Sequence, residues 1–133
     1  MAIDGDRLVT FYREQIALGS CVAGAILGLA DIGKASETEV VHRFVSDPDK
    51  DVRSAALYAL RKLDPSSARA EAGKLIVDPS KRIRALAESV LLEHHDRGVV
   101  ERGRELLLSS DVMHRMVGLS LLNKFGGWEP LAD

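Results

Sequence analysis

One stretch of the chain has the residue types of a metal site. Residues Glu93 to Asp96 place two histidines between two carboxylates, and both kinds of side chain bind zinc in proteins. Adjacent residues of a helix point about 100° apart, so His94 and His95 are poorly placed to share one ion. No histidine pair stands at a spacing of four residues within this stretch. The sequence therefore predicts structural histidines and no metal site.

A second candidate is Cys21, the chain's single cysteine. An internal disulfide is thereby excluded, and a reducing compartment is expected. A nucleophile or a bilin-attachment site would need an accessible, activated thiol. Cys21 falls in phase with an apolar stripe, so we expect it to be a buried small hydrophobe. The nearby run from Gly19 to Gly24 lacks the Lys-Ser/Thr of a phosphate-binding loop, and we expect its glycines to allow close helix packing.

The remaining composition points away from catalysis and from the common non-protein partners. No Ser-His-Asp order, paired carboxylates or nucleotide fingerprint is recognisable, so a non-enzymatic protein without a cofactor or metal is predicted. The net charge of −2 gives no bulk attraction to nucleic acid or membrane. The longest apolar stretch, Cys21 to Ala30, has about half the length of a bilayer span. We therefore expect a cytoplasmic protein.

The elements that position these residues follow an internal repeat of 31 residues. Asp47-Pro48 recurs as Asp78-Pro79, and Arg53 recurs as Arg84 and Arg115. Around each arginine the apolar positions follow the spacing of one face of an α-helix, and the central position is always Ala or Gly, which favours close helix packing. The expected core positions, copy by copy, are Cys21, Gly24, Ala25, Gly28, Leu29 and Ile32; Val52, Ala55, Ala56, Ala59, Leu60 and Leu63; Ile83, Leu86, Ala87, Val90, Leu91 and His94; and His114, Val117, Gly118, Leu121, Leu122 and Phe125.

Another helix is expected before each of these stripes, and the residues between the helices agree with that arrangement. The expected first helices span residues 6–18, 37–46, 68–77 and 98–108. Ser36 and Glu39 predict a capping box. Asp47-Pro48 and Asp78-Pro79, the pairs that recur with the repeat, each predict an N-cap followed by proline at the first helical position. Gly33, Gly126 and Gly127 are expected to follow helix ends. Aromatic residues make up only 5% of the chain, which also favours closely packed helices over a β-sandwich.

The copies DPDKDVRSAALYAL, from residue 47, and DPSKRIRALAESVL, from residue 78, resemble HEAT repeats of the phycobilisome-lyase type. The resemblance covers residues 36–126 well and residues 6–35 loosely. It implies an all-α fold, a right-handed α-solenoid of about four HEAT-like helix pairs within one armadillo-like domain. The expected repeats are residues 5–33, 36–63, 67–95 and 98–126, with 127–133 as a tail or the start of a further repeat.

The same resemblance implies a ladder of aspartates and arginines that bond along the solenoid. The positions that match it are Asp47, Arg53, Asp78, Arg84 and Arg115. In the fourth copy Ser109 stands in the place of the aspartate, and Asp111 is its expected substitute. In the family, the second helix of each pair lies on the concave side.

The residues after each central Ala or Gly predict where a partner binds. They point away from the core stripe, and several are large and apolar, so they would form an apolar strip on the second helices. We therefore expect a scaffold that binds a protein or peptide there, either by itself or as a segment of a larger protein. The expected contact residues are Ile26, Leu27, Leu57, Tyr58, Arg61, Glu88, Leu92, Leu119 and Asn123. The alternative left open is that adjacent repeats cover part of the strip.

Two other functions remain as alternatives. Residues 53–104 hold 11 basic and 7 acidic groups, which would suit nucleic-acid binding. The cations concerned are Arg53, Arg61, Lys62, Lys81, Arg82 and Arg84. A bilin-lyase-like activity is implied only by the resemblance of the repeats.

The end of the sequence adds an expectation about self-association. After Gly126-Gly127 the chain stops where the first helix of a further repeat would begin. Either the sequence is part of a longer solenoid, or Trp128 folds back over Phe125 and Leu122. A terminal repeat without a cap would expose apolar surface, so the chain would associate with a second copy.

Overall fold

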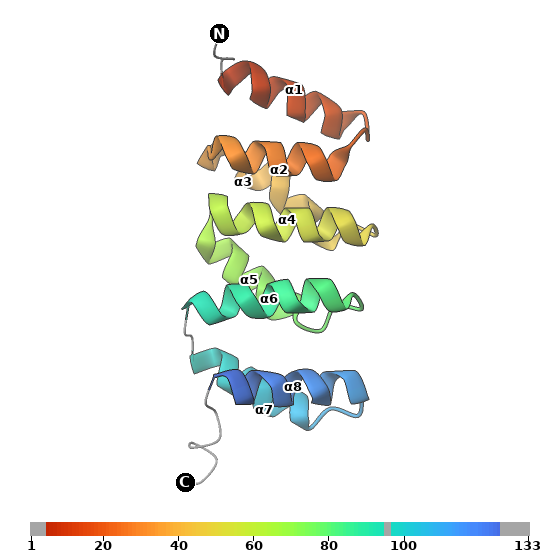
Figure 1. Ribbon diagram of the computed structural model, residues 1–133, viewed down its shortest axis with the longest axis vertical. Helices are drawn as coiled ribbons and strands as arrows, with labels where there is room; N and C mark the ends of the chain where they lie inside the picture. Colours follow the sequence, from red (N-terminus) through yellow and green to blue (C-terminus); the bar gives the residue numbers. More distant parts are fainter. Residues whose placement is uncertain (1–4, 95–96, 126–133) are drawn as a thin grey trace. The chain divides into compact units, whose positions relative to one another are not determined.

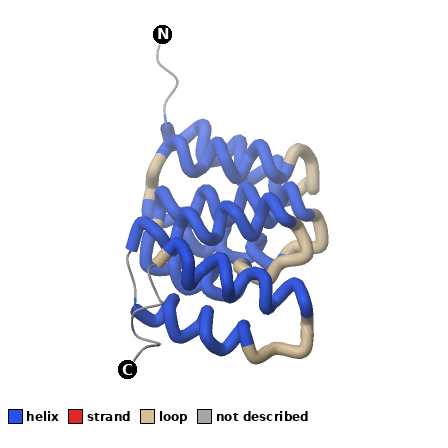
Figure 2. The backbone as a smooth tube through the Cα atoms, turned by 60° about the horizontal axis from the view of Figure 1, so that its bottom comes forward, coloured by secondary structure: helices blue, strands red, loops and turns tan. Residues whose placement is uncertain are grey.

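A computed structural model describes residues 5–94 and 97–125, and this part of the chain is all-helical, as the sequence predicts (Figure 1). Eight α-helices and two short 3-10 segments follow one another, and the described residues contain no strand (Figure 2). The order is α1 (Gly5–Ala17), α2 (Val22–Ile32), η1 (Ala35–Glu37), α3 (Thr38–His42), η2 (Arg43–Ser46), α4 (Lys50–Leu63), α5 (Pro65–Leu75), α6 (Lys81–His94), α7 (Arg97–Leu107) and α8 (Val112–Lys124).

The chain divides into two compact units, Met1–Glu71 and Ala72–Asp133. In the first unit α1 packs on α2, while α4 packs against both α2 and α3. In the second unit α7 packs on α8, and hydrogen bonds to Glu88 connect α6 with α8. The expected first helices overlap α1, α3 and η2 together, α5 and α7, with the largest offset at α5, which begins three residues before the expected start.

The core of the first unit is best predicted in α4. All six expected stripe positions of this helix are buried, from Val52 to Leu63. In α2 the prediction holds for Ala25 and Leu29 and is wrong for two others, because Cys21 and Gly24 are exposed. Cys21 lies just before the helix, in a left-handed conformation with φ of 50°, so it lies outside the helical register on which the stripe depends.

In the second unit α6 and α8 bury most of the expected stripe. The buried members are Ile83, Ala87, Val90, Leu91, Val117, Gly118, Leu121 and Leu122. Leu86, His114 and Phe125 are half-buried, and the side chain of His94 lies outside the described part.

The expected close approach at a small residue is found at Gly118. A Cβ atom at this position would lie 2.6 Å from the carbonyl oxygen of Gly103, so α7 and α8 meet backbone against backbone. A second close approach is at Gly28, where a Cβ would lie 2.3 Å from Cζ of Tyr12, so this glycine makes room for the tyrosine ring. Gly24, by contrast, has open space around it, and Gly19 lies in a turn with φ of 70°. Close packing therefore does not explain the run from Gly19 to Gly24.

The predicted capping box is wrong. Ser36 lies inside η1, and the residue before α3 is Glu37, which makes no side-chain cap. Gly33 does end α2, in the expected left-handed conformation with φ of 74°, whereas Gly126 and Gly127 lie outside the described residues.

The two predicted Asp-Pro caps are also displaced. Asp47 and Asp78 each accept a hydrogen bond from the amide two residues later, in the turn before the helix. The side chain that caps α4 is that of Asp49, and Asp111 caps α8 in the same way. A third Asp-Pro pair does begin a helix, because Asp64 precedes Pro65, the first residue of α5, and accepts hydrogen bonds from Ser67.

The recurrent arginines have the same local role in three copies. Nη1 of Arg53 donates to the carbonyl oxygen of Asp47 at 2.9 Å, and Nη1 of Arg84 donates to that of Asp78 at 2.7 Å. Arg115 donates to the carbonyl of Ser109 at 2.8 Å. Each arginine therefore connects the first turn of its own helix, by a side-chain hydrogen bond, to the loop that precedes that helix. The ladder between repeats stays a prediction.

Candidate functional site

The expected partner-binding residues divide into exposed and buried groups. Leu27, Tyr58, Leu119 and Asn123 are exposed, while Arg61, Glu88 and Leu92 are half-buried. Ile26 and Leu57 are fully buried, so the prediction of one continuous exposed strip is wrong at these two positions. The reason in α4 is that the helix packs against both α2 and α3, so its buried face is wider than a single stripe.

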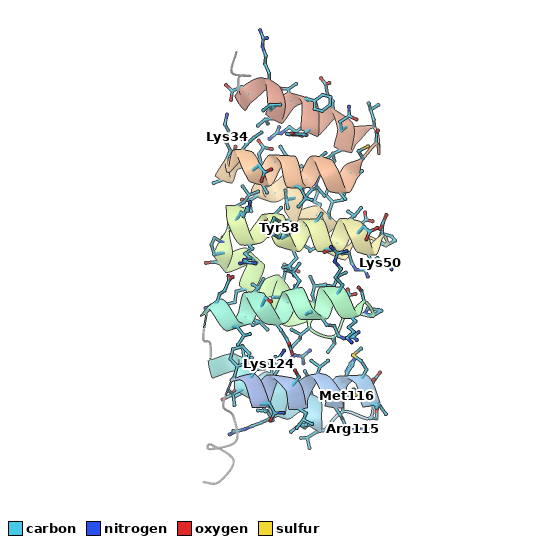
Figure 3. The ribbon with its side chains drawn as sticks, in the orientation of Figure 1. Lys34, Lys50, Tyr58, Arg115, Met116 and Lys124 are labelled. Carbon is cyan, nitrogen blue, oxygen red and sulfur yellow. The ribbon has the colours of Figure 1, made fainter. Side chains whose placement is uncertain are left out.

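In the first unit, Leu27 and Tyr58 keep an apolar surface on neighbouring helices. They occupy equivalent positions of α2 and α4, and their side chains are 38% and 39% exposed. Beside them, Nζ of Lys62 donates to Oδ1 of Asp31 at 3.3 Å and lies 5.2 Å from the centre of the Tyr58 ring (Figure 3 labels Tyr58). The hydrogen bond to Asp31, and then the tyrosine, raise the pKa of Lys62 above its ordinary value. The apolar pair is therefore bordered by an ion pair that connects the same two helices.

In the second unit, the exposed apolar residues of α8 form a row. Val112, Met116 and Leu119 follow each other at steps of four and three residues and are all exposed (Figure 3 labels Met116). Next to this row, α8 is held to α6 by Glu88, which accepts hydrogen bonds from Ser120 at 2.8 Å and Lys124 at 2.5 Å. The expected contact residue Glu88 thus has partners within its own unit.

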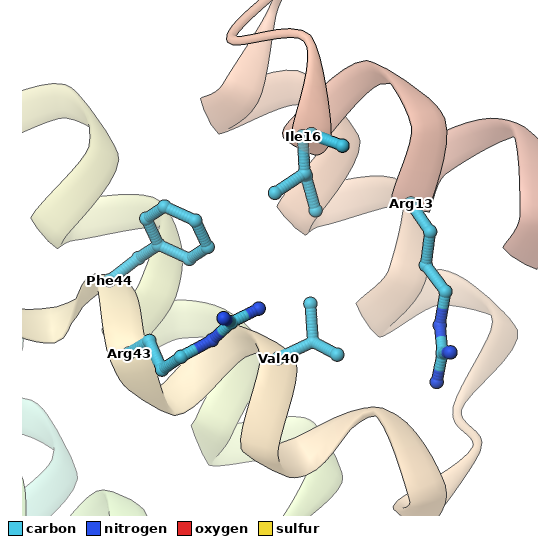
Figure 4. Close-up of a pocket in the computed structure, with 6 residues that line it drawn as sticks. Arg13, Ile16, Val40, Arg43 and Phe44 are labelled. Atoms are coloured by element: carbon cyan, nitrogen blue, oxygen red, sulfur yellow. The ribbon is translucent and has the colours of Figure 1, made fainter.

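The first unit also has two adjacent hollows beside α3, which the repeat pattern of the sequence does not predict. One has a volume of about 360 Å³, and Figure 4 shows it between α1 and the segment from α3 to η2. The second, of about 440 Å³, shares Val40 and Arg43 with the first. The first is lined by Arg13, Ile16, Ala17, Val40, Arg43 and Phe44, and the second by Glu39, Val40, His42 and Arg43.

The signal for these hollows was present in the expected helix 37–46. Its apolar residues include Val40, Val41, Phe44 and Val45, more than one helix face can bury. Val41 and Val45 are buried, whereas Val40 and Phe44 are only half-buried and line the first hollow.

The two arginines of the first hollow differ in their partners. Arg13 binds Glu37 through Nε at 2.8 Å and Nη2 at 2.9 Å, and the carboxylate is almost fully buried, with 2% exposure. Hydrogen bonding and the charge of Glu37 raise the pKa of Arg13. The guanidinium carbon of Arg43 lies 6.0 Å from the centre of the Phe44 ring. Among the described residues, the side chain of Arg43 has no hydrogen bond or ion pair, so no ion pair compensates its charge beside the hollow.

The cations expected for nucleic-acid binding are partly engaged in other interactions. Arg53 and Arg84 donate to backbone carbonyls, and Lys62 pairs with Asp31. Lys81 and Arg82 are exposed at the start of α6. The six residues come from two units that are described separately, so nucleic-acid binding stays an alternative prediction.

The expectation of a buried Cys21 is wrong, since this free cysteine is exposed. Within residues 5–94 and 97–125, no three His, Cys, Asp or Glu side chains are grouped so that they would hold a metal ion. The side chain of His94 and all of His95 and Asp96 lie outside that part.

None of the described helices combines the length and apolar character needed to cross a membrane.

Comparison with known proteins adds no family: no family model matches the chain, and no curated protein matches it. The resemblance to HEAT repeats and the solenoid that it implies therefore stay predictions.

Proposed function

We propose that this protein is a non-enzymatic module that binds a protein or peptide partner through the second helices of its repeats. The observation that carries the proposal is the exposure of Leu27 and Tyr58 at equivalent positions of α2 and α4. Covering the exposed parts of two such side chains would contribute about 1 kcal/mol each to binding. The HEAT-like spacing of the sequence supports the same function, because helical repeats commonly present extended binding surfaces.

The surroundings of the pair suit a protein partner. Tyrosine is one of the residue types enriched at the energetic centres of protein interfaces, where an apolar centre is surrounded by polar groups. Here Asp31 and Lys62 provide the polar border, and their ion pair connects the two helices. An interface on this surface would therefore have an apolar centre with charged groups at its edge.

The experiment that tests this proposal compares two double variants of the full chain. In the first, Leu27→Asp is combined with Tyr58→Asp; in the control, Phe11→Asp is combined with Leu18→Asp. Phe11 and Leu18 are exposed apolar residues of the same unit that lie on α1 and in the loop after it, so the control has the same change of charge and polarity at another place.

Each immobilised variant is exposed to native lysate, and the captured proteins are quantified by mass spectrometry. We expect the first variant to lose the proteins that wild type captures and the control to keep them, with unchanged helicity by circular dichroism for both. Equal capture by the first variant and wild type would show that Leu27 and Tyr58 are not the binding surface.

A further inference from the structure

We propose that the two hollows beside α3 form one groove that binds an acidic segment of a partner protein. An aliphatic side chain of that segment would occupy the first hollow, and the Asp or Glu that follows it would pair with Arg43. This groove lies on α1 and α3, whereas Leu27 and Tyr58 lie on α2 and α4, so the inference stands independently of the function proposed above.

The first hollow has the lining that an aliphatic side chain needs. Ile16 comes from α1, and Val40 and Phe44 come from α3 and η2; Figure 4 shows these three side chains around the hollow. Its volume of about 360 Å³ accommodates one large side chain together with part of the backbone that carries it. Val40 and Phe44 are only half-buried by the protein itself, so a bound side chain would cover apolar surface that is now exposed to water.

The charges around the first hollow favour a carboxylate. Both charged residues that line it are arginines. Arg13 is compensated by the buried Glu37, but the Arg43 side chain has no hydrogen bond or ion pair among the described residues. Figure 4 shows the Arg43 guanidinium extended between Phe44 and Val40, next to the apolar lining. A planar guanidinium in this position binds a carboxylate through two parallel N–H groups.

The second hollow indicates that the partner chain passes Arg43 and continues. Val40 and Arg43 line both hollows, so an extended peptide that fills the first would reach the second without leaving the surface. In the second hollow Glu39 is exposed, and His42 binds Glu71 at 2.9 Å. This end of the groove therefore does not favour a second acidic residue. The expected ligand is an internal segment with one aliphatic residue followed directly by one carboxylate.

The test uses three synthetic peptides with acetylated and amidated ends. The first has the sequence Gly-Ser-Leu-Asp-Ser-Gly, and the other two have Asn or Lys in the place of Asp. Each is titrated into the ¹⁵N-labelled full chain and followed by chemical shifts. We expect saturable shifts at the amides of Ile16, Val40, Arg43 and Phe44 with the Asp peptide. The Asn peptide should bind about threefold more weakly, as one exposed ion pair predicts.

Reversing the charge at residue 43 tests whether the Arg43 guanidinium itself binds the carboxylate of the peptide. Arg43 is exposed, so Arg43→Glu should leave the fold intact. The variant should bind the Asp peptide about tenfold more weakly than wild type and bind the Lys peptide more tightly. The matched control is Arg7→Glu, which makes the same change of charge on the exposed part of α1 outside the hollow. Three results would each overturn the proposal that this groove binds an acidic segment. They are equal binding of the three peptides, equal effects of the two variants, and shifts confined to Leu27 and Tyr58. The last result would leave the function proposed for α2 and α4 standing.

Discussion

The carbonyl oxygen of Gly103 occupies the space in which a side chain of Gly118 would begin. A Cβ atom on Gly118 would lie 2.6 Å from that oxygen and 2.9 Å from Cβ of Leu106. Van der Waals contact requires about 3.4 Å or more, so α7 and α8 would have to separate to admit even one methyl group. The second unit therefore depends on glycine at this position for the packing of its last two helices.

We predict that Gly118→Ala lowers the free energy of unfolding by about 1–3 kcal/mol, as overpacking of a core does. This loss would appear although alanine favours a helix over glycine by about 1 kcal/mol. The control is Gly73→Ala in α5, where a Cβ meets nothing within 4 Å and stability should rise by about 0.5–1 kcal/mol. Urea titrations of both variants measure the difference. A Gly118→Ala protein as stable as wild type would contradict the backbone contact of α7 and α8.

The repeat predicts the core well where the helix remains regular. Every expected position of α4 from Val52 to Leu63 is buried, because the helix keeps its register over its whole length. In the first copy the same spacing fails at Cys21, because α2 begins one residue later. The period of 31 transfers a position from one copy to another, but it does not show where the helix of that copy begins.

The left-handed backbone of Cys21 leads to a second prediction. Its φ of 50° disfavours any residue with a Cβ atom, at a cost of about 1–2 kcal/mol. Cys21→Gly removes that cost. Glycine also makes the unfolded chain more flexible, which offsets part of the gain, so we expect a net rise in the free energy of unfolding of about 1 kcal/mol.

Cys21→Ala is the control for this prediction, because it removes the thiol and keeps the strained conformation. Its unfolding midpoint in urea should therefore stay close to that of wild type. If Cys21→Ala gained as much stability as Cys21→Gly, the thiol itself would be the cause, and the backbone argument would fail.

The candidate site was harder to predict than the core, because exposure depends on contacts far along the chain. Leu57 is apolar and lies beside the core stripe, and it is fully buried in a helix that packs on both α2 and α3. Glu37 is buried, and its carboxylate is paired with Arg13, which is 24 residues away in the sequence. The groove beside α3 depends on the same kind of contact, since Ile16 comes from another helix than Val40. A repeat pattern carries no information about such pairs.

The carboxylate at the start of α5 gives a prediction about pH. The hydroxyl of Ser67 donates to Asp64 at 2.8 Å and the Ser67 amide donates at 3.3 Å; these bonds, the hydroxyl first, lower the pKa of Asp64 in the folded protein. Since the folded pKa lies below the unfolded value of about 3.9, the carboxylate stabilises the fold above that value and loses this contribution as the pH falls through the folded pKa. We therefore expect Asp64→Asn to be less stable than wild type at pH 7 and the difference to shrink below about pH 4.

Ser67→Ala removes the hydroxyl that lowers the pKa of Asp64 most. In that variant, ¹³C titration of the Asp64 carboxyl should therefore give a higher pKa than in wild type. An unchanged value would show that the hydroxyl does not stabilise the charge.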